Sequence, residues 1–240
     1  TSTWSLANSS RSRLLTALDA GLNQPSELSL KAMNDFQLKA FDLLSTSSTQ
    51  RAFELDKERS QDRERFGRNI YGQSVLLARR LIEAGTRFVT VSWAPDANAT
   101  WDTHGGNFIK LRNTLLPQFD AACSSLLEDL DSRGLLDRTL VAVLGDFGRT
   151  PKVNTAGGRD HWNACYSVML AGGGMKTGQV IGSSSRKGEY VADRPVKFQE
   201  IFATLYHNIG MDGNHPRVFD ASGTPRNLVD DGIKPMRELI

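Results

Sequence analysis

The stretch TLVAVLGDFGRTPKVNTAGGRDHW, residues 139–162, is the part of the sequence around which we expect the fold to form. Its apolar beginning, 139–144, predicts a buried strand that ends at a glycine. Groups able to do chemistry follow this strand in loops, namely Asp146, Arg149, Asp160 and His161. Ligands of open α/β sheets bind beyond the carboxyl ends of the strands. We therefore predict a functional site at the end of this strand.

Apolar periodicity on both sides of this stretch predicts alternating helices and strands. Helices are expected at 71–84, 108–130 and 198–209, and further strands at 88–93 and 166–170. A strand, a helix and a strand in this order favour a parallel pair joined by a crossover. The predicted fold class is therefore α/β, with a largely parallel sheet flanked by helices.

The remaining segments are predicted to be less regular. Residues 1–60 carry apolar side chains at helical spacing, so we expect a helical segment that packs on the core or leads into it. Residues 61–240 are then the main domain. The charged stretch 56–68 is expected to be a solvated helical face or a hinge, and 179–181 is expected to pair with 189–191 as a hairpin or as edge strands.

Length and composition limit the class of protein. With 240 residues, 39% of them hydrophobic, the chain can bury a substantial core. Its 29 basic and 27 acidic residues leave a net charge of +2, which predicts no strong attraction to nucleic acid. No apolar run approaches the roughly 18 residues that a membrane span requires. Cys123 and Cys165 lie in apolar patterns and are expected to be buried thiols rather than a disulfide.

Asp102 and His104 lie in a loop directly before the expected helix 108–130. An aspartate at this place can simply cap the first turn of the helix. Together with Asp146 and His161, however, these residues make a set of loop carboxylates and imidazoles, which are typical ligands of divalent cations. We therefore predict a metal site formed by these four residues for Zn²⁺, Mn²⁺, Mg²⁺ or Ca²⁺.

Arg149 and Asp160 are the candidate substrate-binding residues. The planar guanidinium of Arg149 matches two oxygens of a phosphate or a sulfate group. The alternatives are a surface ion pair for Arg149 and a salt-bridged turn for Asp160 and His161. The letters DFG at 146–148 also occur in protein kinases, but the other kinase motifs are absent, and no GxSxG string of a serine hydrolase occurs.

Five motifs occur along the chain in a familiar order: YGQSVLLARRLIEAGTRFVTVSW, WDTHGGNFIKLRNTLLPQFD, LLEDLDSRGLLDRTLVAVLGDFGRTPKVN, GRDHW and LAGGGMKTGQVIG. From about Arg51 to the end, the sequence closely resembles the bacterial domain-of-unknown-function family 1501. That family is similar to the alkaline phosphatase and sulfatase superfamily, whose enzymes hydrolyse or transfer phosphate or sulfate esters at a two-metal site. The resemblance implies an alkaline phosphatase-like fold, of which this chain is expected to be the carboxyl-terminal part.

The resemblance also implies roles for single residues. In the superfamily an Asp and a His before a long helix bind one metal and a later His completes that site, which corresponds to Asp102, His104 and His161. The strand after the helix normally ends in an Asp-His-Gly string, whose first two side chains bind the other metal. Here Asp146 keeps the carboxylate, but Phe147 replaces the imidazole.

Two functions are compatible with these residues. The first is a metal-dependent hydrolase or transferase that acts on phosphate or sulfate esters of a small molecule or a polysaccharide. The second is a non-catalytic binding or scaffold module that keeps the sulfatase-like fold, because Phe147 stands in a ligand position. The superfamily places its nucleophile in an amino-terminal half that has no counterpart here. We therefore expect this chain to act together with the missing amino-terminal half of the same protein. The resemblance also suggests export to the periplasm or the exterior of a bacterium.

Overall fold

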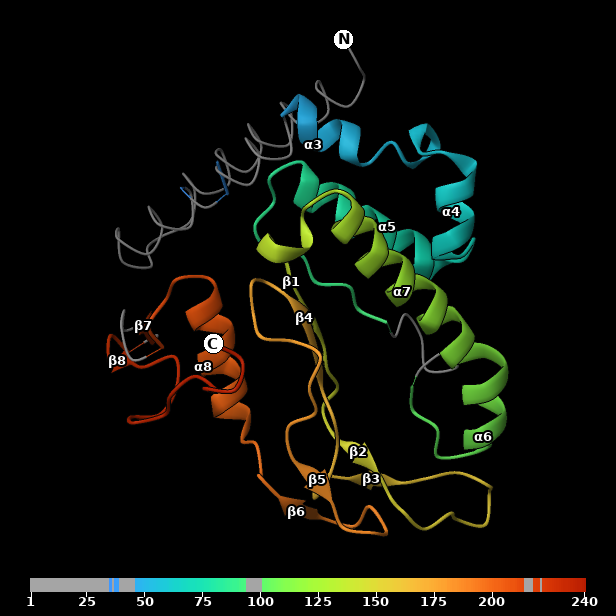
Figure 1. The fold of residues 1–240 in the computed structure, drawn as a ribbon, viewed down its shortest axis with the longest axis vertical. Coiled ribbons are helices and arrows are strands. Elements are labelled where there is room, and N and C mark those ends of the chain that lie inside the picture. Colours follow the sequence, from blue (N-terminus) through green and yellow to red (C-terminus); the bar gives the residue numbers. More distant parts are fainter. Residues whose placement is uncertain (1–34, 36, 39–45, 94–100, 214–217, 221) are drawn as a thin grey trace, which may run out of the picture. The chain divides into compact units, whose positions relative to one another are not determined.

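The structure is a computed structural model that describes residues 35, 37, 38, 46–93, 101–213, 218–220 and 222–240 (Figure 1). The helices expected before residue 46 lie almost entirely outside the described residues. The chain divides into two compact units. One consists of Thr1–Asp62 and Leu76–Thr90, and the other consists of Arg63–Val75 and Val91–Ile240. All the predicted site residues belong to the second unit.

A buried ion pair organises the first unit. Arg79 on α5 (Ile70–Glu83) is 1% exposed, and its guanidinium lies 3.0 Å from the carboxylate of Glu58. Desolvation alone would raise the pKa of Glu58, but the ion pairs with Arg79 and Arg80 lower it below its ordinary value. The sequence analysis expected the stretch 56–68 to be solvated, but the side chain of Glu58 within it is only 11% exposed. The other helices here are α3 (Ser47–Ala52), η1 (Leu55–Lys57) and the first residues of α4 (Ser60–Phe66).

One long helix in the second unit consists of three consecutive segments: α6 (Asn107–Lys110), η2 (Leu111–Leu115) and α7 (Leu116–Ser132) (Figure 1). The η2 segment is π-helical, and the amide of Leu116 reaches back to the carbonyl of Leu111. Pro117 follows directly and has no N–H to donate, which accounts for an irregular hydrogen-bond pattern at this point. Gly134, with a φ of 65°, follows the helix end. The helix predicted at 108–130 is thus confirmed.

The strands of the described residues form four two-stranded antiparallel ladders. β1 (Leu140–Val143) pairs with β4 (Met169–Gly172), with Leu140 opposite Gly172. The other pairs are β2 (Gly148–Arg149) with β3 (His161–Trp162), β5 (Ser183–Ser184) with β6 (Val191–Asp193), and β7 (Val218–Phe219) with β8 (Pro225–Arg226). The fold therefore mixes helices and strands as predicted, but the described residues contain no parallel sheet.

The missing strand at 88–93 explains this difference. Those residues belong to no ladder, and Phe88 is 83% exposed. A parallel pair needs one strand on each side of a crossover helix. Within residues 46–93 and 101–106 no strand precedes the helix 107–132, and β1 pairs with β4, which runs in the opposite direction. The expected hairpin near 179–191 does form, as β5 and β6, a few residues later than predicted.

The last helix, α8 (Phe198–Asn208), packs on the carboxyl-terminal segment. Ile201 on this helix contributes to a buried cluster with Met236 and Leu239. The hydroxyl of Thr204 accepts a hydrogen bond of 2.9 Å from the Met236 amide. The segment is therefore held by both apolar contacts and a buried hydrogen bond.

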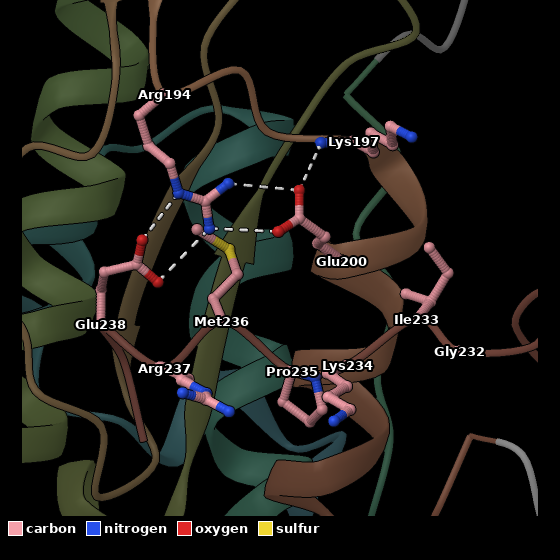
Figure 2. A pocket seen from close by; sticks show the side chains of 10 residues that line it. All are labelled: Arg194, Lys197, Glu200, Gly232, Ile233, Lys234, Pro235, Met236, Arg237 and Glu238. Atoms are coloured by element: carbon pink, nitrogen blue, oxygen red, sulfur yellow. Dashed lines mark hydrogen bonds and ion pairs between the residues drawn. The ribbon is translucent and has the colours of Figure 1, made fainter.

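Arg194 adds an ionic link between α8 and this segment. Its guanidinium lies 2.7 Å from Glu238 and 3.1 Å from Glu200, and the hydrogen bonds that it donates to both carboxylates raise the pKa of Arg194 (Figure 2). These three residues line a surface pocket of about 520 Å³. Arg194 has a φ of 42°, and no other non-glycine residue in the described parts of the chain has a positive φ. The two ion pairs fix the side chain of a residue whose backbone lies in a rarely populated conformation.

Two further expectations concern membrane-spanning helices and the two cysteines. Among the helices that the structure describes, none combines the length and the apolar character needed to cross a bilayer. Cys123 and Cys165 are free thiols, as expected, but both are half-buried rather than fully buried. Burial raises the pKa of Cys123, and the neighbouring charge of Asp120 adds to this effect.

Candidate functional site

The ladder of β2 and β3 brings Arg149 and His161 together. The two residues are direct partners in this antiparallel pair. Opposite residues of such a pair present their side chains to the same face of the ladder. Gly148, next to Arg149, lies so close to its neighbours that an added Cβ would be 2.1 Å from the carbonyl oxygen of Cys165. The pair thereby closes the intervening loop, residues 150–160.

The loop that carries Asp102 and His104 is docked on the loop between β2 and β3. The amides of Gly106 and Asn107 donate to the carbonyls of Ala156 and Gly157, at 3.1 and 3.0 Å. These bonds satisfy amides of the first helical turn, which no residue of α6 can pair. The residue that precedes α6 is Gly106, and no side chain caps the helix. Asp102 therefore does not cap this helix, which was the alternative role considered for it.

Two imidazoles, those of His104 and His161, approach one carboxylate oxygen of Asp102. Nδ1 of His104 contacts Oδ1 of Asp102, and Nε2 of His161 lies 3.7 Å from the same oxygen. The two imidazole centroids are 4.5 Å apart. One ligand atom from each of the three residues lies within 4.8 Å of the others. We call Asp102, His104 and His161 the Asp-His-His cluster. Each of its side chains is about half exposed, so the cluster is open to solvent.

Arg149 is the charged neighbour of this cluster. Its Nη2 lies 3.0 Å from Oδ1 of Asp102 and also donates to the carbonyl of Trp101 at 3.0 Å, while Nη1 donates to the carbonyl of Arg159 at 3.1 Å. Desolvation alone would raise the pKa of Asp102, but the hydrogen bonds from Arg149 and His104 lower it. These contacts therefore favour the ionised form of Asp102, which is the form that binds a cation.

Asp160 and Asp146 lie outside the cluster. Oδ1 of Asp160 accepts a hydrogen bond of 2.9 Å from the side chain of Asn154, within the loop between β2 and β3. Asp146 is exposed in the loop between β1 and β2 and is not a member of the group of adjacent metal-ligand atoms found in the described residues. Of the four predicted metal ligands, the structure thus brings three together.

Phe147 takes part in the site without offering a ligand. Its ring centroid lies 3.9 Å from that of His161, and the Cζ atom of Arg149 lies 5.8 Å from the same ring. The aromatic side chain therefore restricts the imidazole of His161 by packing. Sequence comparison had singled out Phe147 only for the imidazole that it replaces.

The chemistry of the cluster fits a divalent cation. Carboxylate oxygen and imidazole nitrogen bind Zn²⁺ at about 2.0–2.2 Å, which separates neighbouring ligand atoms by roughly 3–3.5 Å. The separation of 3.7 Å between His161 and Asp102 is close to this range. The contact between His104 and Asp102 would have to lengthen, and the imidazole nitrogen would have to lose its proton. Three ligands at an exposed position would leave room for water or a substrate.

Sequence reasoning overlooked Asn154 and Gly158. The amide group of Asn154 makes several hydrogen bonds in the loop between β2 and β3, and one of them reaches the carbonyl of His104 at 2.9 Å. An added Cβ at Gly158 would lie 1.7 Å from that same carbonyl oxygen. The string Asn-Thr-Ala-Gly-Gly at 154–158 is a recognisable turn signal, but it does not indicate which distant loop the turn contacts.

The fold and the site thus define a protein of mixed helices and small antiparallel ladders that carries a solvent-exposed cluster of potential metal ligands. The chain belongs to the family described as "Protein of unknown function (DUF1501)", whose profile matches residues 5–240. The resemblance seen in the five motifs is therefore confirmed at the level of this family. No curated protein and no solved structure matches the chain.

Proposed function

We propose that this protein is a metal-dependent hydrolase or transferase of phosphate or sulfate esters. The observation that carries the proposal is the convergence of Asp102, His104 and His161 on one point, with Arg149 bound to the same carboxylate oxygen. A cation ligand set beside a guanidinium suits a substrate that carries an oxyanion. The substrate class is an ester of a small molecule or of a polysaccharide.

In this proposal the Asp-His-His cluster holds one divalent cation. Asp146 contributes to a second cation from its exposed loop, and Arg149 or Asp160 orients the ester group of the substrate. The chemistry that a cation held by Asp102, His104 and His161 would supply is polarisation of the ester oxygen and a lowered pKa of a water or hydroxyl nucleophile. Arg149 lowers the pKa of Asp102 and ties the loop of Trp101 to the loop of Arg159, so its contribution includes the placement of the carboxylate.

We further propose descent from the alkaline phosphatase and sulfatase superfamily. The support comes from the order of motifs and from the position of the cluster. His104 precedes the long helix 107–132, and Asp146 follows β1, as the resemblance implies. The described residues form small antiparallel ladders, and these ladders do not support the parallel sheet that the resemblance implies.

Metal content tests the proposal directly. Elemental analysis is performed on the wild-type protein and on an Asp102→Ala, His161→Ala double variant, both after equilibration with Zn²⁺, Mn²⁺, Mg²⁺ and Ca²⁺ in turn. We expect the variant to bind one equivalent fewer than the wild type, because the cation of the cluster is lost. An Asp131→Ala, His207→Ala double variant removes the same residue types at exposed positions of α7 and α8 and serves as the control. Equal metal content in the wild type and the cluster variant would contradict the metal site.

A second candidate function is a non-catalytic binding or scaffold module. The packing of Phe147 on His161 favours it, because an aromatic ring stands where the superfamily uses a second imidazole. Both candidates predict bound metal, and turnover separates them. Hydrolysis of any member of a panel of aryl phosphate and aryl sulfate esters by the metal-loaded protein, lost on Asp102→Ala, supports the enzyme. Retained metal with no turnover on the whole panel supports the binding module.

A further inference from the structure

The side chain of Asn154 connects the two segments that carry the histidines of the cluster. Its Nδ2 donates to the main-chain carbonyl of His104 and to Oδ1 of Asp160, at 2.9 Å in each case. Asp160 directly precedes His161 in the chain. One amide group therefore reaches both histidine-bearing segments.

The other end of the same amide group fixes its orientation. Oδ1 of Asn154 accepts hydrogen bonds from the amides of Ala156 and Gly158, at 3.0 and 2.9 Å. Because two backbone N–H groups can only donate, the oxygen of the side chain must face them and the NH₂ group must face His104 and Asp160. The turn 154–158 thus holds the donor end in one direction.

The close approach of the two loops depends on this turn. The main-chain amide of Arg159 donates to the carbonyl of Thr103 at 3.1 Å, and Gly158 faces the carbonyl of His104 with no space for a side chain. Asn154 is half-buried at this junction. An aspartate would keep the acceptor for the turn but would lose the donor and repel Asp160, so only an amide of this length satisfies both sides.

We infer that Asn154 is a positioning residue of the Asp-His-His cluster, which sets the distance between the imidazoles of His104 and His161. The inference rests on the proposed function, because the distance between the imidazoles affects metal affinity only if both of them bind one ion. Asn154 itself is not a ligand, since its oxygen already accepts two backbone hydrogen bonds. Residues that orient metal ligands in this way typically change metal affinity by about 10–100-fold when they are replaced.

The decisive variant is Asn154→Asp, which has the same shape, removes the donor end and adds a negative charge next to Asp160. Two measurements are made on the whole 240-residue chain. The first is the nuclear Overhauser effect between the ring protons of His104 and His161 in metal-free protein. The second is the affinity for Co²⁺ alone, followed by its visible absorption spectrum. We expect Asn154→Asp to weaken the ring contact and to lower the Co²⁺ affinity about tenfold or more, with an altered spectrum.

Two further variants separate positioning from general damage. Asn113→Asp makes the same chemical change at an exposed position of η2 and should alter neither measurement. The swap Asn154→Asp, Asp160→Asn reverses donor and acceptor between the two side chains, and it should recover part of the ring contact because the link between residues 154 and 160 is restored. Thermal unfolding of each variant shows whether the chain is folded.

The outcomes distinguish the inference from the proposed function. If the wild type binds no Co²⁺, the proposed function fails, and the ring contact alone decides the inference. If Asn154→Asp is folded and keeps the wild-type ring contact, the inference is overturned, whatever the metal result. If Asn154→Asp is unfolded, Asn154→Gln keeps the amide at a greater length, and an unchanged ring contact in that variant also overturns the inference.

Discussion

The ring of Phe147 packs on the imidazole of His161, with centroids 3.9 Å apart and planes inclined by 35°. This contact gives the phenylalanine a role that its position in the motif does not reveal. An imidazole that is packed on one face has fewer rotamers to lose when it binds an ion, so the contact favours binding. The cluster therefore depends on an apolar neighbour as well as on its hydrogen bonds.

Phe147→Ala should loosen His161 and lower the affinity for Co²⁺ by about tenfold. The cost in unfolding free energy should be only about 1–2 kcal/mol, because the side chain is 37% exposed and its burial is incomplete. Co²⁺ titration and urea unfolding measure the two effects. Phe219→Ala, which removes a more exposed ring from β7, is the control and should leave the affinity unchanged. Equal affinity in Phe147→Ala would show that the ring does not restrict His161.

Gly158→Ala should separate the two loops of the site. The added Cβ would lie 1.7 Å from the His104 carbonyl oxygen, which is main chain and cannot turn aside. We expect a loss of about 3 kcal/mol of unfolding free energy, together with loss of the contact between the two imidazoles. Gly105→Ala is the matched control, because an added Cβ there meets nothing within 4 Å. Calorimetry and ring-proton NMR would detect the difference, and a similar stability of the two variants would argue against close docking.

Glu58 should make the stability of the first unit dependent on pH. Its pKa is lowered in the folded state, so its ion pairs stabilise the fold above the ordinary glutamate pKa of about 4.3. This stabilisation is lost as the pH falls through the lowered pKa of the folded protein. Glu58→Gln should therefore cost about 3 kcal/mol at pH 7, because it removes the carboxylate that the buried Arg79 shares with Arg80, and much less near pH 3.

Urea unfolding at the two pH values measures this effect. Glu64→Gln, which removes an exposed partner of Arg68, is the control and should change the stability by less than about 1 kcal/mol at either pH. A constant difference between the wild type and Glu58→Gln from pH 7 to pH 3 would show that the carboxylate is not ionised in the ion pair.

Glu238→Gln should loosen the carboxyl-terminal segment without unfolding the protein. The substitution weakens one of the two carboxylate contacts of Arg194, and the remaining contact is with Glu200. We expect the Lys176 amide, which donates to the Leu239 carbonyl, to exchange with deuterium a few-fold faster. Hydrogen exchange followed by NMR measures the rate. Glu189→Gln, an exposed carboxylate elsewhere in the same unit, should leave that rate unchanged.

Local patterns in the sequence predicted the individual elements well. The helices at 71–84, 108–130 and 198–209 correspond to Ile70–Glu83, to the continuous helix 107–132 and to Phe198–Asn208. Apolar spacing and a terminal glycine are local signals, because a helix pairs its backbone within itself. The strand at 139–144 was also predicted from its own residues and appears as Leu140–Val143.

The direction of the strands was not predictable in the same way. A strand pairs with a partner that is distant in sequence, so its direction depends on which segment lies beside it. The sequence favoured 88–93 as a strand parallel to the strand at 139–144. In the structure β1 pairs with β4 instead, and this ladder is antiparallel. The alternation of apolar residues cannot distinguish these two partners.

The sequence by itself determined which kinds of side chain are present in the loops, and hence the choice of four candidate metal ligands, namely Asp102, His104 and His161 together with Asp146. Only the tertiary structure decided that these three meet while Asp146 stays apart, and that Asn154, Gly158 and Phe147 support them. The physical reason is that the chemical character of a ligand is a property of one residue. The distance between ligands depends instead on hydrogen bonds and close contacts between loops, which no single segment contains.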